Sequence, residues 1–340
     1  MRRRDFLKQS VVATGAGVLV AACGDAAKDL KEGYADARSG GAADPAGSAA
    51  AMTGNGLYAI SLAQWSLHRA IRSGELDPLD FAVAARQEFD IGGIEYVNGL
   101  FTDRRTDEEY LRELAKRATD NDVTSVLIMC DGEGRIGDPD DAARTQTIDN
   151  HRRWIDAASF LGCHSIRVNA QSEGDWDTQK ALAADGLRRL TEVAAEQDIN
   201  VIVENHGGIS SNGAWLAEVM ETVDHPRCGT LPDFGNWDIG DGEQYDFYQG
   251  TEELMPFAKA VSFKTHILSA DPEGPHFRTD WAGTRYPIDF ERLMRITLDA
   301  GYRGWVGIEF EGSEVDEYEG IRQSRAVLEH LHEKLKADYA

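Results

Sequence analysis

Short apolar runs recur along the chain from Leu57 onward, and amphipathic stretches separate them. Eight of these runs have the length of buried strands: YAISLAQWSL, IGGIEYV, VTSVLIMC, HSIRVNA, NVIVENH, GTLPDFG, AVSFKTH and WVGIEFEG. The segments between them place apolar residues at helical spacing, as in PLDFAVAARQEF, DEEYLRELAKRATD, ARTQTIDNHRRWIDAASFLG, DTQKALAADGLRRLTEVAAEQ and IDFERLMRITLDAG. Several of these segments follow Asp or Pro and end at Gly, which is typical of helix caps.

Regular alternation of strands and helices predicts a parallel sheet, and eight such units predict a sheet that closes into a barrel. We therefore expect an α/β fold, a single-domain (β/α)8 TIM barrel over residues 56–340. An open doubly wound sheet is the alternative. It is disfavoured because QWSLHRAI, and not a glycine-rich nucleotide-binding loop, stands at the end of the first run.

The residues before this domain predict an export signal and a tether. Residues 1–22 combine a basic start, an apolar stretch and small residues before Cys23. The segment RRDFLK (3–8) resembles a twin-arginine signal, and VAAC (20–23) resembles a lipoprotein cleavage site. We expect export to the periplasm or cell surface, with the membrane contacted only through a lipid anchor at Cys23; an ordinary cleaved signal is the alternative. Residues 23–55 read as a flexible linker, because Ala, Gly, Asp and Ser dominate them.

Charge narrows the class of partner. The chain has 59 acidic and 35 basic residues, a net charge of −24. Loss of residues 1–22, which carry four basic and one acidic residue, makes it −27. Such a surface repels nucleic acid and anionic lipid headgroups, because binding phosphates needs clustered Lys and Arg. We expect a small-molecule substrate and no nucleic-acid partner.

Polar side chains end the last four apolar runs. They are Glu204, Asn205 and His206 in the fifth run, Asp233 and Asn236 at the sixth, Lys264 and His266 in the seventh, and Glu309 and Glu311 in the eighth. The carboxyl ends of barrel strands open onto one face, so these groups are expected to converge there. Three carboxylates and one imidazole predict a site for one divalent ion, formed by Glu204, Asp233, His266 and Glu309. The carboxylates favour Mg²⁺ or Mn²⁺, and the histidine also admits Co²⁺ or Zn²⁺.

Each of these residues also has a structural interpretation. Glu309 could pair with an interior Lys or Arg, Asp233 could cap a helix, and His266 could be an ordinary core histidine. Lys264 faces the same side of its strand as His266. It is a candidate second acid/base or oxyanion partner, or else an interior ion-pair partner of Glu95 or of a ligand carboxylate.

The order Glu, Asp, His, Glu on the fifth to eighth strands resembles the xylose-isomerase-like TIM-barrel superfamily. The segments GGIEYVNGLF, VENHGGISSN, GTLPDFGNW and FKTHI resemble its sugar phosphate isomerase/epimerase group, which includes D-tagatose 3-epimerase. The resemblance covers residues 57–335 and implies that Glu204, Asp233, His266 and Glu309 are metal ligands. It also implies that Glu204 and Glu309 exchange a proton with the carbon next to a substrate carbonyl.

The sequence departs from those epimerases around the substrate. Asn236 stands where they carry a histidine, and no arginine closely follows His266, although His276 and Arg278 could enter from that loop. His206 and Lys264 are untypical of them. The expected substrate-binding set is His68, Glu95, Arg167, Asn169, His206, Asn236, His276 and Arg278.

The leading functional hypothesis is a metal-dependent sugar isomerase/epimerase that enolises a keto sugar through a metal-bound enediolate. A 3-keto-glycoside eliminase or lyase acting at the same site is the runner-up. Two further alternatives are an endonuclease IV-like phosphodiesterase and a non-catalytic sugar-binding lipoprotein. A homo-oligomer is compatible with all of them.

Overall fold

The computed structural model describes residues 56–104 and 106–339. The predicted signal (1–22), linker (23–55) and lipid anchor at Cys23 lie outside these residues. The eight apolar runs form one eight-stranded sheet of order β6-β5-β4-β3-β2-β1-β12-β9, in which all neighbouring strands are parallel. The strands are β1 (Ala59–Ala63), β2 (Gly93–Val97), β3 (Thr124–Met129), β4 (Ser165–Val168), β5 (Asn200–Glu204), β6 (Cys228–Leu231), β9 (Val261–Thr265) and β12 (Trp305–Phe310).

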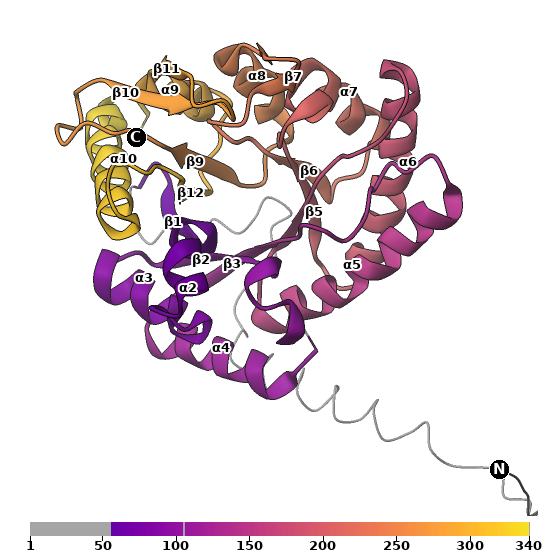
Figure 1. Cartoon of the computed structure of the whole chain (residues 1–340), viewed down its shortest axis with the longest axis horizontal. Helices are drawn as coiled ribbons and strands as arrows, with labels where there is room; N and C mark the ends of the chain where they lie inside the picture. Colours follow the sequence, from indigo (N-terminus) through magenta and orange to yellow (C-terminus); the bar gives the residue numbers. More distant parts are fainter. Residues whose placement is uncertain (1–55, 105, 340) are drawn as a thin grey trace, which may run out of the picture. The chain divides into compact units, whose positions relative to one another are not determined.

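The two edge strands of this sheet meet and close it. Residues just beyond β6 form a parallel bridge to β9 at Asp233 and Ser262. Ser262 N–H donates to Pro232 O at 2.9 Å, and Phe234 N–H donates to Ser262 O at 3.1 Å. Figure 1 shows the resulting curled sheet with helices around it. The predicted TIM barrel is confirmed.

Helices follow most strands and cover the outside of the barrel. They are α2 (His68–Ser73), α3 (Phe81–Phe89), α4 (Glu108–Asp120), α5 (Asp141–Leu161), α6 (Trp176–Ala195), α7 (Gly213–Val223), α8 (Phe247–Leu254), α9 (Phe290–Asp299) and α10 (Glu317–Tyr339). Short 3-10 turns lie at Gln64–Leu67, Pro78–Asp80, Asn98–Leu100, Thr102–Arg104, Gly208–Ser211 and Met255–Phe257. The predicted caps are present: Asp107, Asp140 and Asp289 accept backbone N–H groups at the starts of α4, α5 and α9.

Side chains alternate across each strand, so one set packs under the helices and the other fills the barrel. Leu127, Ile202 and Leu231 belong to a small apolar cluster that is separate from the large cluster under the helices. Two residues beyond Ile202 and Leu231, on the same faces, stand Glu204 and Asp233. The barrel interior therefore changes from apolar to charged towards the carboxyl ends of its strands.

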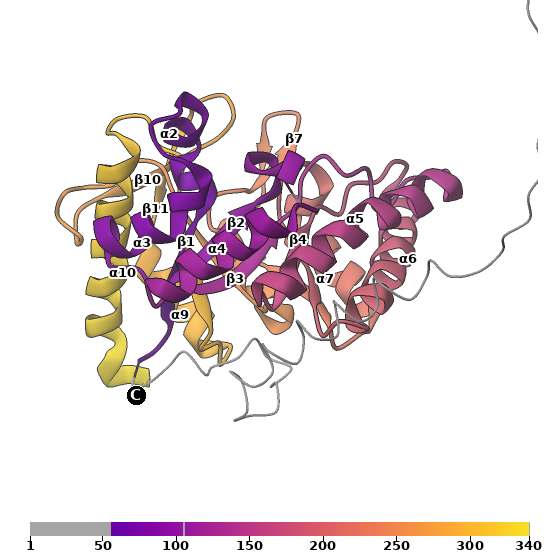
Figure 2. The same ribbon diagram turned by 90° about the horizontal axis from the view of Figure 1, so that it is seen from below.

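Two hairpins that the apolar pattern did not predict follow β6 and β9. The first pairs β7 (Asp238–Gly240) with β8 (Glu243–Gln244), and the second pairs β10 (His276–Thr279) with β11 (Arg285–Ile288). Figure 2 places β7, β10 and α2 at the same end of the barrel. Among the described residues, no helix combines the length and apolarity that a membrane span requires.

Candidate active site

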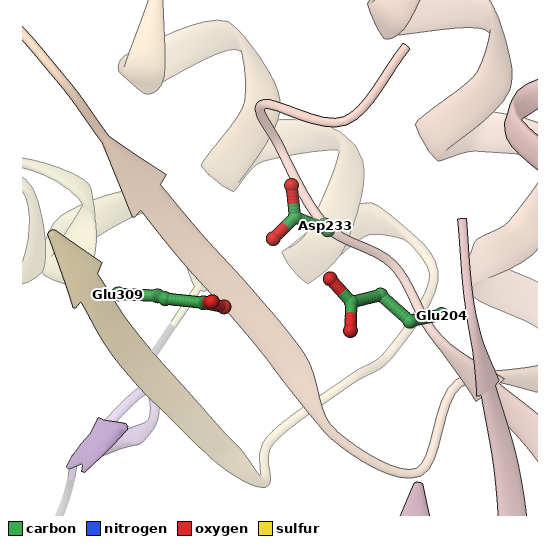
Figure 3. Close-up of side chains that lie close together, drawn as sticks. All are labelled: Glu204, Asp233 and Glu309. Carbon is green, nitrogen blue, oxygen red and sulfur yellow. The ribbon is translucent and has the colours of Figure 1, made fainter. Parts of the chain in front are cut away.

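Three buried carboxylates meet at the carboxyl ends of the strands. Glu204 is the last residue of β5, Asp233 follows β6, and Glu309 lies near the end of β12. One oxygen from each lies within 4.8 Å of the others, and the three residues are between 0% and 4% exposed. Figure 3 shows the side chains of Glu204, Asp233 and Glu309 pointing towards one space from β5, from the segment after β6 and from β12.

The ammonium group of Lys264 lies among these carboxylates. Its Nζ is 3.1 Å from Glu309 Oε1, 3.6 Å from Asp233 Oδ2 and 4.0 Å from Glu204 Oε1. It also donates a hydrogen bond of 3.1 Å to Glu311 Oε1. Burial disfavours the charged form of Lys264, but Asp233 and Glu309 outweigh this and hold its pKa well above the ordinary value. Of the two structural interpretations of Lys264, pairing with the carboxylates therefore describes the observed contacts, and pairing with Glu95 does not.

Ser262, also on β9, joins two of the acids. Its hydroxyl lies 2.6 Å from Asp233 Oδ2 and 3.0 Å from Glu309 Oε2. A hydroxyl has one proton to donate, so both contacts are hydrogen bonds only when one carboxyl is protonated. Burial, and then the negative charges of Glu204 and Asp233, raise the pKa of Glu309 well above its ordinary value. Glu309 is therefore the carboxyl suited to carry that proton.

Glu204 has its own partners on the other side of the site. Asn236 Nδ2 donates to Glu204 Oε1 at 2.9 Å. Arg167 Nε lies 2.8 Å from Glu204 Oε2, but neither atom has a hydrogen-bond partner, so the pair is a charge contact without hydrogen-bond alignment. Arg167 Nη1 also donates to Asp131 Oδ1 at 2.7 Å. These contacts fix Glu204 beside the ammonium of Lys264.

Asp233 is held by the turn that follows β6. Its Oδ1 accepts the backbone N–H groups of Gly235 and Asn236, both at 2.8 Å. This agrees with the turn-like character of its sequence, although no helix starts there. Burial raises the pKa of Asp233 to about 6. The other oxygen, Oδ2, is left to face Ser262 and Lys264.

His266 does not join the three carboxylates, in contrast to the expected ligand set. Strand register gives the reason: Lys264 is the β9 residue level with Glu309, and His266 lies two residues further, beyond the end of β9. The imidazole instead lines a smaller cavity of about 190 Å³. Burial, then the charge of Lys264, lowers the pKa of His266 to about 4, and its Nδ1 is buried without a hydrogen-bond partner.

The main cavity, about 580 Å³, reaches the three carboxylates at Glu309. Of the expected substrate-binding residues, it is lined by Arg167, Asn169 and His206, together with Glu309 and Glu311. The smaller cavity holds Asn236 and Arg278 beside His266.

Three expected substrate-binding residues line neither of these two cavities. His68 stacks on Trp65, which does line the main cavity, with ring centroids 4.6 Å apart. Glu95 accepts a 2.6 Å hydrogen bond from Ser61. Its carboxylate packs against the backbone at Gly307, which leaves no room for a Cβ there. His276, the first residue of β10, packs on Phe290, the first residue of α9.

Comparison with known proteins identifies the family of the chain. The family model described as "Xylose isomerase-like TIM barrel" matches residues 81–331. The chain belongs to this family. The predicted superfamily is therefore confirmed.

Three proteins that this chain resembles share less than 25% of its residues in the aligned regions. Inosose dehydratase of Erwinia tasmaniensis is 24% identical over 192 residues, which cover 49% of this chain and only 64% of that protein's length. The structure of 3-keto-D-glucoside 4-epimerase from E. coli aligns with a TM-score of 0.57 and 18% identity over 74% of this chain and 94% of that one. The structure of a xylose isomerase-like TIM barrel protein from Mycobacterium smegmatis, in complex with magnesium, aligns with a TM-score of 0.60 and 16% identity. The alignment covers 83% of this chain and 98% of that one. At such identities the structural likeness establishes the fold.

The carboxylates form a site that could hold a metal ion. Their oxygens, with the hydroxyl of Ser262 beside them, are the hard donors that Mg²⁺ and Mn²⁺ prefer. Three buried acids in contact also need positive charge. The donor set therefore fits a hard divalent cation at Glu204, Asp233 and Glu309, where the ammonium of Lys264 lies in this structure.

Several site residues were not expected from the sequence. Ser262 read as an ordinary strand residue, although its spacing of two from Lys264 places both on one face. Asp131, directly after the third apolar run, forms an ion pair with Arg167. Trp65 and Trp281 line the main cavity. The strand-end position of Asp131 is the one cue that could have found it.

Proposed function

We propose that this protein is a carbohydrate enzyme that removes the proton next to the carbonyl of a keto sugar or keto-glycoside. The observation that carries the proposal is that an oxygen of Glu204 and one of Glu309 lie within 4.8 Å of each other beside the ammonium of Lys264, and that Glu309 lines the main cavity. Two carboxyl groups and a cation are what proton transfer through an enolate requires.

The contacts of each site residue suggest its role in the reaction. Glu204 is oriented by Asn236 and flanked by Arg167, and we assign it as the group that takes the proton. Glu309, whose pKa burial raises, is the group that returns one. Lys264 and Arg167 carry the positive charge that stabilises the developing enolate oxygen. A divalent cation bound by Glu204, Asp233 and Glu309 would supply Lewis-acid polarisation of the carbonyl.

The cavity supports a sugar-sized substrate. Its volume of about 580 Å³ lies within the range of roughly 300–1,000 Å³ that small-molecule sites occupy. Arg167, Asn169 and His206 supply hydrogen-bonding groups, and Trp65 and Trp281 supply aromatic faces. This mixture suits rings that present both hydroxyls and C–H faces.

The proposal includes both epimerisation and elimination, because in both reactions the substrate first loses the proton next to its carbonyl. Return of a proton to the other face epimerises the carbon, whereas departure of a neighbouring hydroxyl or glycosidic oxygen gives a lyase. The names of the relatives, a 3-keto-glucoside 4-epimerase and an inosose dehydratase, support both outcomes. The endonuclease alternative gains no support, because the acidic group among the described residues includes no histidine.

Solvent exchange tests the proposal. The full chain is incubated in deuterated water with ketohexoses and with a 3-keto-glucoside, once with Mn²⁺ and once with a chelator, and deuterium is located by NMR. We expect deuterium at a carbon next to the carbonyl of at least one compound, and none with Glu309→Gln. Absence of exchange at every such carbon, in all compounds and under both conditions, would reject enolisation.

A further inference from the structure

We propose that Lys264 is a built-in cation of this site, and that its ammonium group and a divalent metal ion compete for the space between Glu204, Asp233 and Glu309. When the metal binds, the ammonium retains Glu311 as its partner. The proposal concerns which cation neutralises the acids, so it stands independently of the reaction proposed above.

Charge is the first argument. Glu204, Asp233 and Glu309 are at most 4% exposed, and like charges in such an environment repel one another and resist desolvation. Lys264, itself 1% exposed, contacts all three. The group therefore has a cation of its own and does not depend on a metal for neutralisation.

Position is the second argument. A cation held by all three carboxylates must lie between them, and the Nζ of Lys264 lies 3.1–4.0 Å from an oxygen of each. Two positive charges placed together there would repel one another strongly. Occupation by a metal ion and by the ammonium are consequently exclusive.

The backbone beside the site is shaped for the lysine. A Cβ built on Gly235 would lie 2.8 Å from Cγ of Lys264 and 3.1 Å from its Cβ and Cδ. Gly235 has no positive φ, so close approach, and not backbone conformation, is what favours glycine here. The turn after β6 thus packs directly on the aliphatic stem that carries the ammonium among the carboxylates.

Glu311 offers the ammonium a second position. Among the described residues, Glu311 is the acceptor of the hydrogen bond that Lys264 donates, at 3.1 Å. Its side chain is 25% exposed, against 0–5% for the three clustered acids, and it lines both cavities. A small shift of Nζ towards Glu311 would vacate the carboxylates without leaving the lysine unpaired.

Metal binding provides the test, with Mn²⁺ alone as the probe and the full chain as the protein. Titration calorimetry or electron paramagnetic resonance of free Mn²⁺ gives the dissociation constant. We expect Lys264→Met to bind Mn²⁺ at least about tenfold more tightly than the wild type, because a competing charge is removed. Glu311→Gln should bind at least about threefold more weakly, because the displaced ammonium loses its partner. Lys180→Met, on the surface with Asp177 and Glu218, is the control and should match the wild type.

A second variant and a second measurement guard against failure of Lys264→Met to fold. Gly235→Ala keeps every charge but presses on the lysine stem, and should also tighten Mn²⁺ binding. Crystals of the wild type soaked in MnCl₂ should show the ion among the three carboxylates and Nζ beside Glu311 alone. Equal or weaker Mn²⁺ binding by Lys264→Met and by Gly235→Ala, or an ion that coexists with Nζ among the acids, overturns the proposal. Because no outcome uses turnover, failure of the enolisation hypothesis leaves this test intact.

Discussion

Arg167 Nε lies 2.8 Å from Glu204 Oε2, and the two side chains are only 3% and 0% exposed. The same guanidinium reaches Asp131, whose side chain is 41% exposed at the cavity, through Nη1 at 2.7 Å. Asp131 and Glu204 outweigh the burial of Arg167, whose pKa stays well above the ordinary value. Arg167 therefore connects a fully buried carboxylate of the site to an acid at the cavity wall.

Replacing Arg167 by Met should destabilise the fold strongly. The substitution leaves the buried charge of Glu204 with one fewer cation, and breaking such a pair costs about 3–5 kcal/mol. Urea unfolding followed by circular dichroism measures the change. Arg152→Met is the matched control, because the ion pair of Arg152 among the described residues is with exposed Asp149, so this variant should lose under about 1 kcal/mol of stability. Equal stability of the two variants would show that Arg167 does not hold the site together.

Glu309→Gln should abolish turnover and preserve the fold. The amide keeps the shape of the side chain but cannot transfer a proton, and loss of a positioned acid or base typically costs about 10²–10⁴ in rate. Steady-state rates on the substrate found by solvent exchange measure this, while binding of that substrate should survive in part. Glu314→Gln, which removes a surface partner of Arg285, should leave the rate unchanged. Turnover by Glu309→Gln within threefold of the wild type would remove Glu309 from the mechanism.

The barrel could be predicted because it repeats. Each apolar run is long enough to be recognised in the sequence on its own. The hairpins β7–β8 and β10–β11 could not be recognised in this way, because their strands have only two to four residues. The strand-end rule placed Glu204, Asp233 and Glu309 on one face, and the structure brings these three together.

The register between neighbouring strands could not be predicted from the sequence. Lys264 and His266 share a face of β9, and only the pairing of β9 with β12 decides which of them stands level with Glu309. The bridge that closes the barrel, between β9 and the residues after β6, puts Ser262 beside Asp233, and nothing in the sequence marks this serine as a site residue. Stagger between neighbouring strands is a property of the closed barrel, so no single strand encodes it.

Stability should depend on pH through Glu95. Burial raises the pKa of this carboxyl to about 7, from an ordinary value of 4.5. Below pH 4.5 both states carry the proton, but between pH 4.5 and 7 the unfolded chain ionises first, so stability falls as pH rises. The loss attributable to Glu95 at pH 8 is about 3 kcal/mol.

Glu95→Gln should remove this loss, because the amide keeps an acceptor for Ser61 and never ionises. Urea unfolding at pH 5 and pH 8 compares the two proteins. We expect similar stability at pH 5 and a variant more stable than the wild type at pH 8. A difference that does not change between the two pH values would mean that Glu95 ionises in the folded protein as readily as in the unfolded chain.

Trp281 should set substrate affinity and leave the chemical step unchanged. It lies in the turn between β10 and β11, is 72% exposed, and nevertheless lines both the main and the smaller cavity. A large apolar side chain left in solvent beside a cavity is suited to cover a ligand. Among the described residues, no hydrogen bond or ion pair joins Trp281 to the three carboxylates. We therefore expect the indole to contact the substrate away from the reacting carbon.

Trp281→Ala should therefore raise KM by about tenfold, the loss of roughly 1.4 kcal/mol of uniform binding, with kcat within twofold of the wild type. Trp176→Ala is the matched control, because Trp176 is the other large exposed apolar side chain among the described residues, at 38%, and lines neither cavity. Its KM should not change. A parallel fall in kcat for Trp281→Ala would instead place the indole in the transition state, and an unchanged KM would remove the β10–β11 turn from substrate binding.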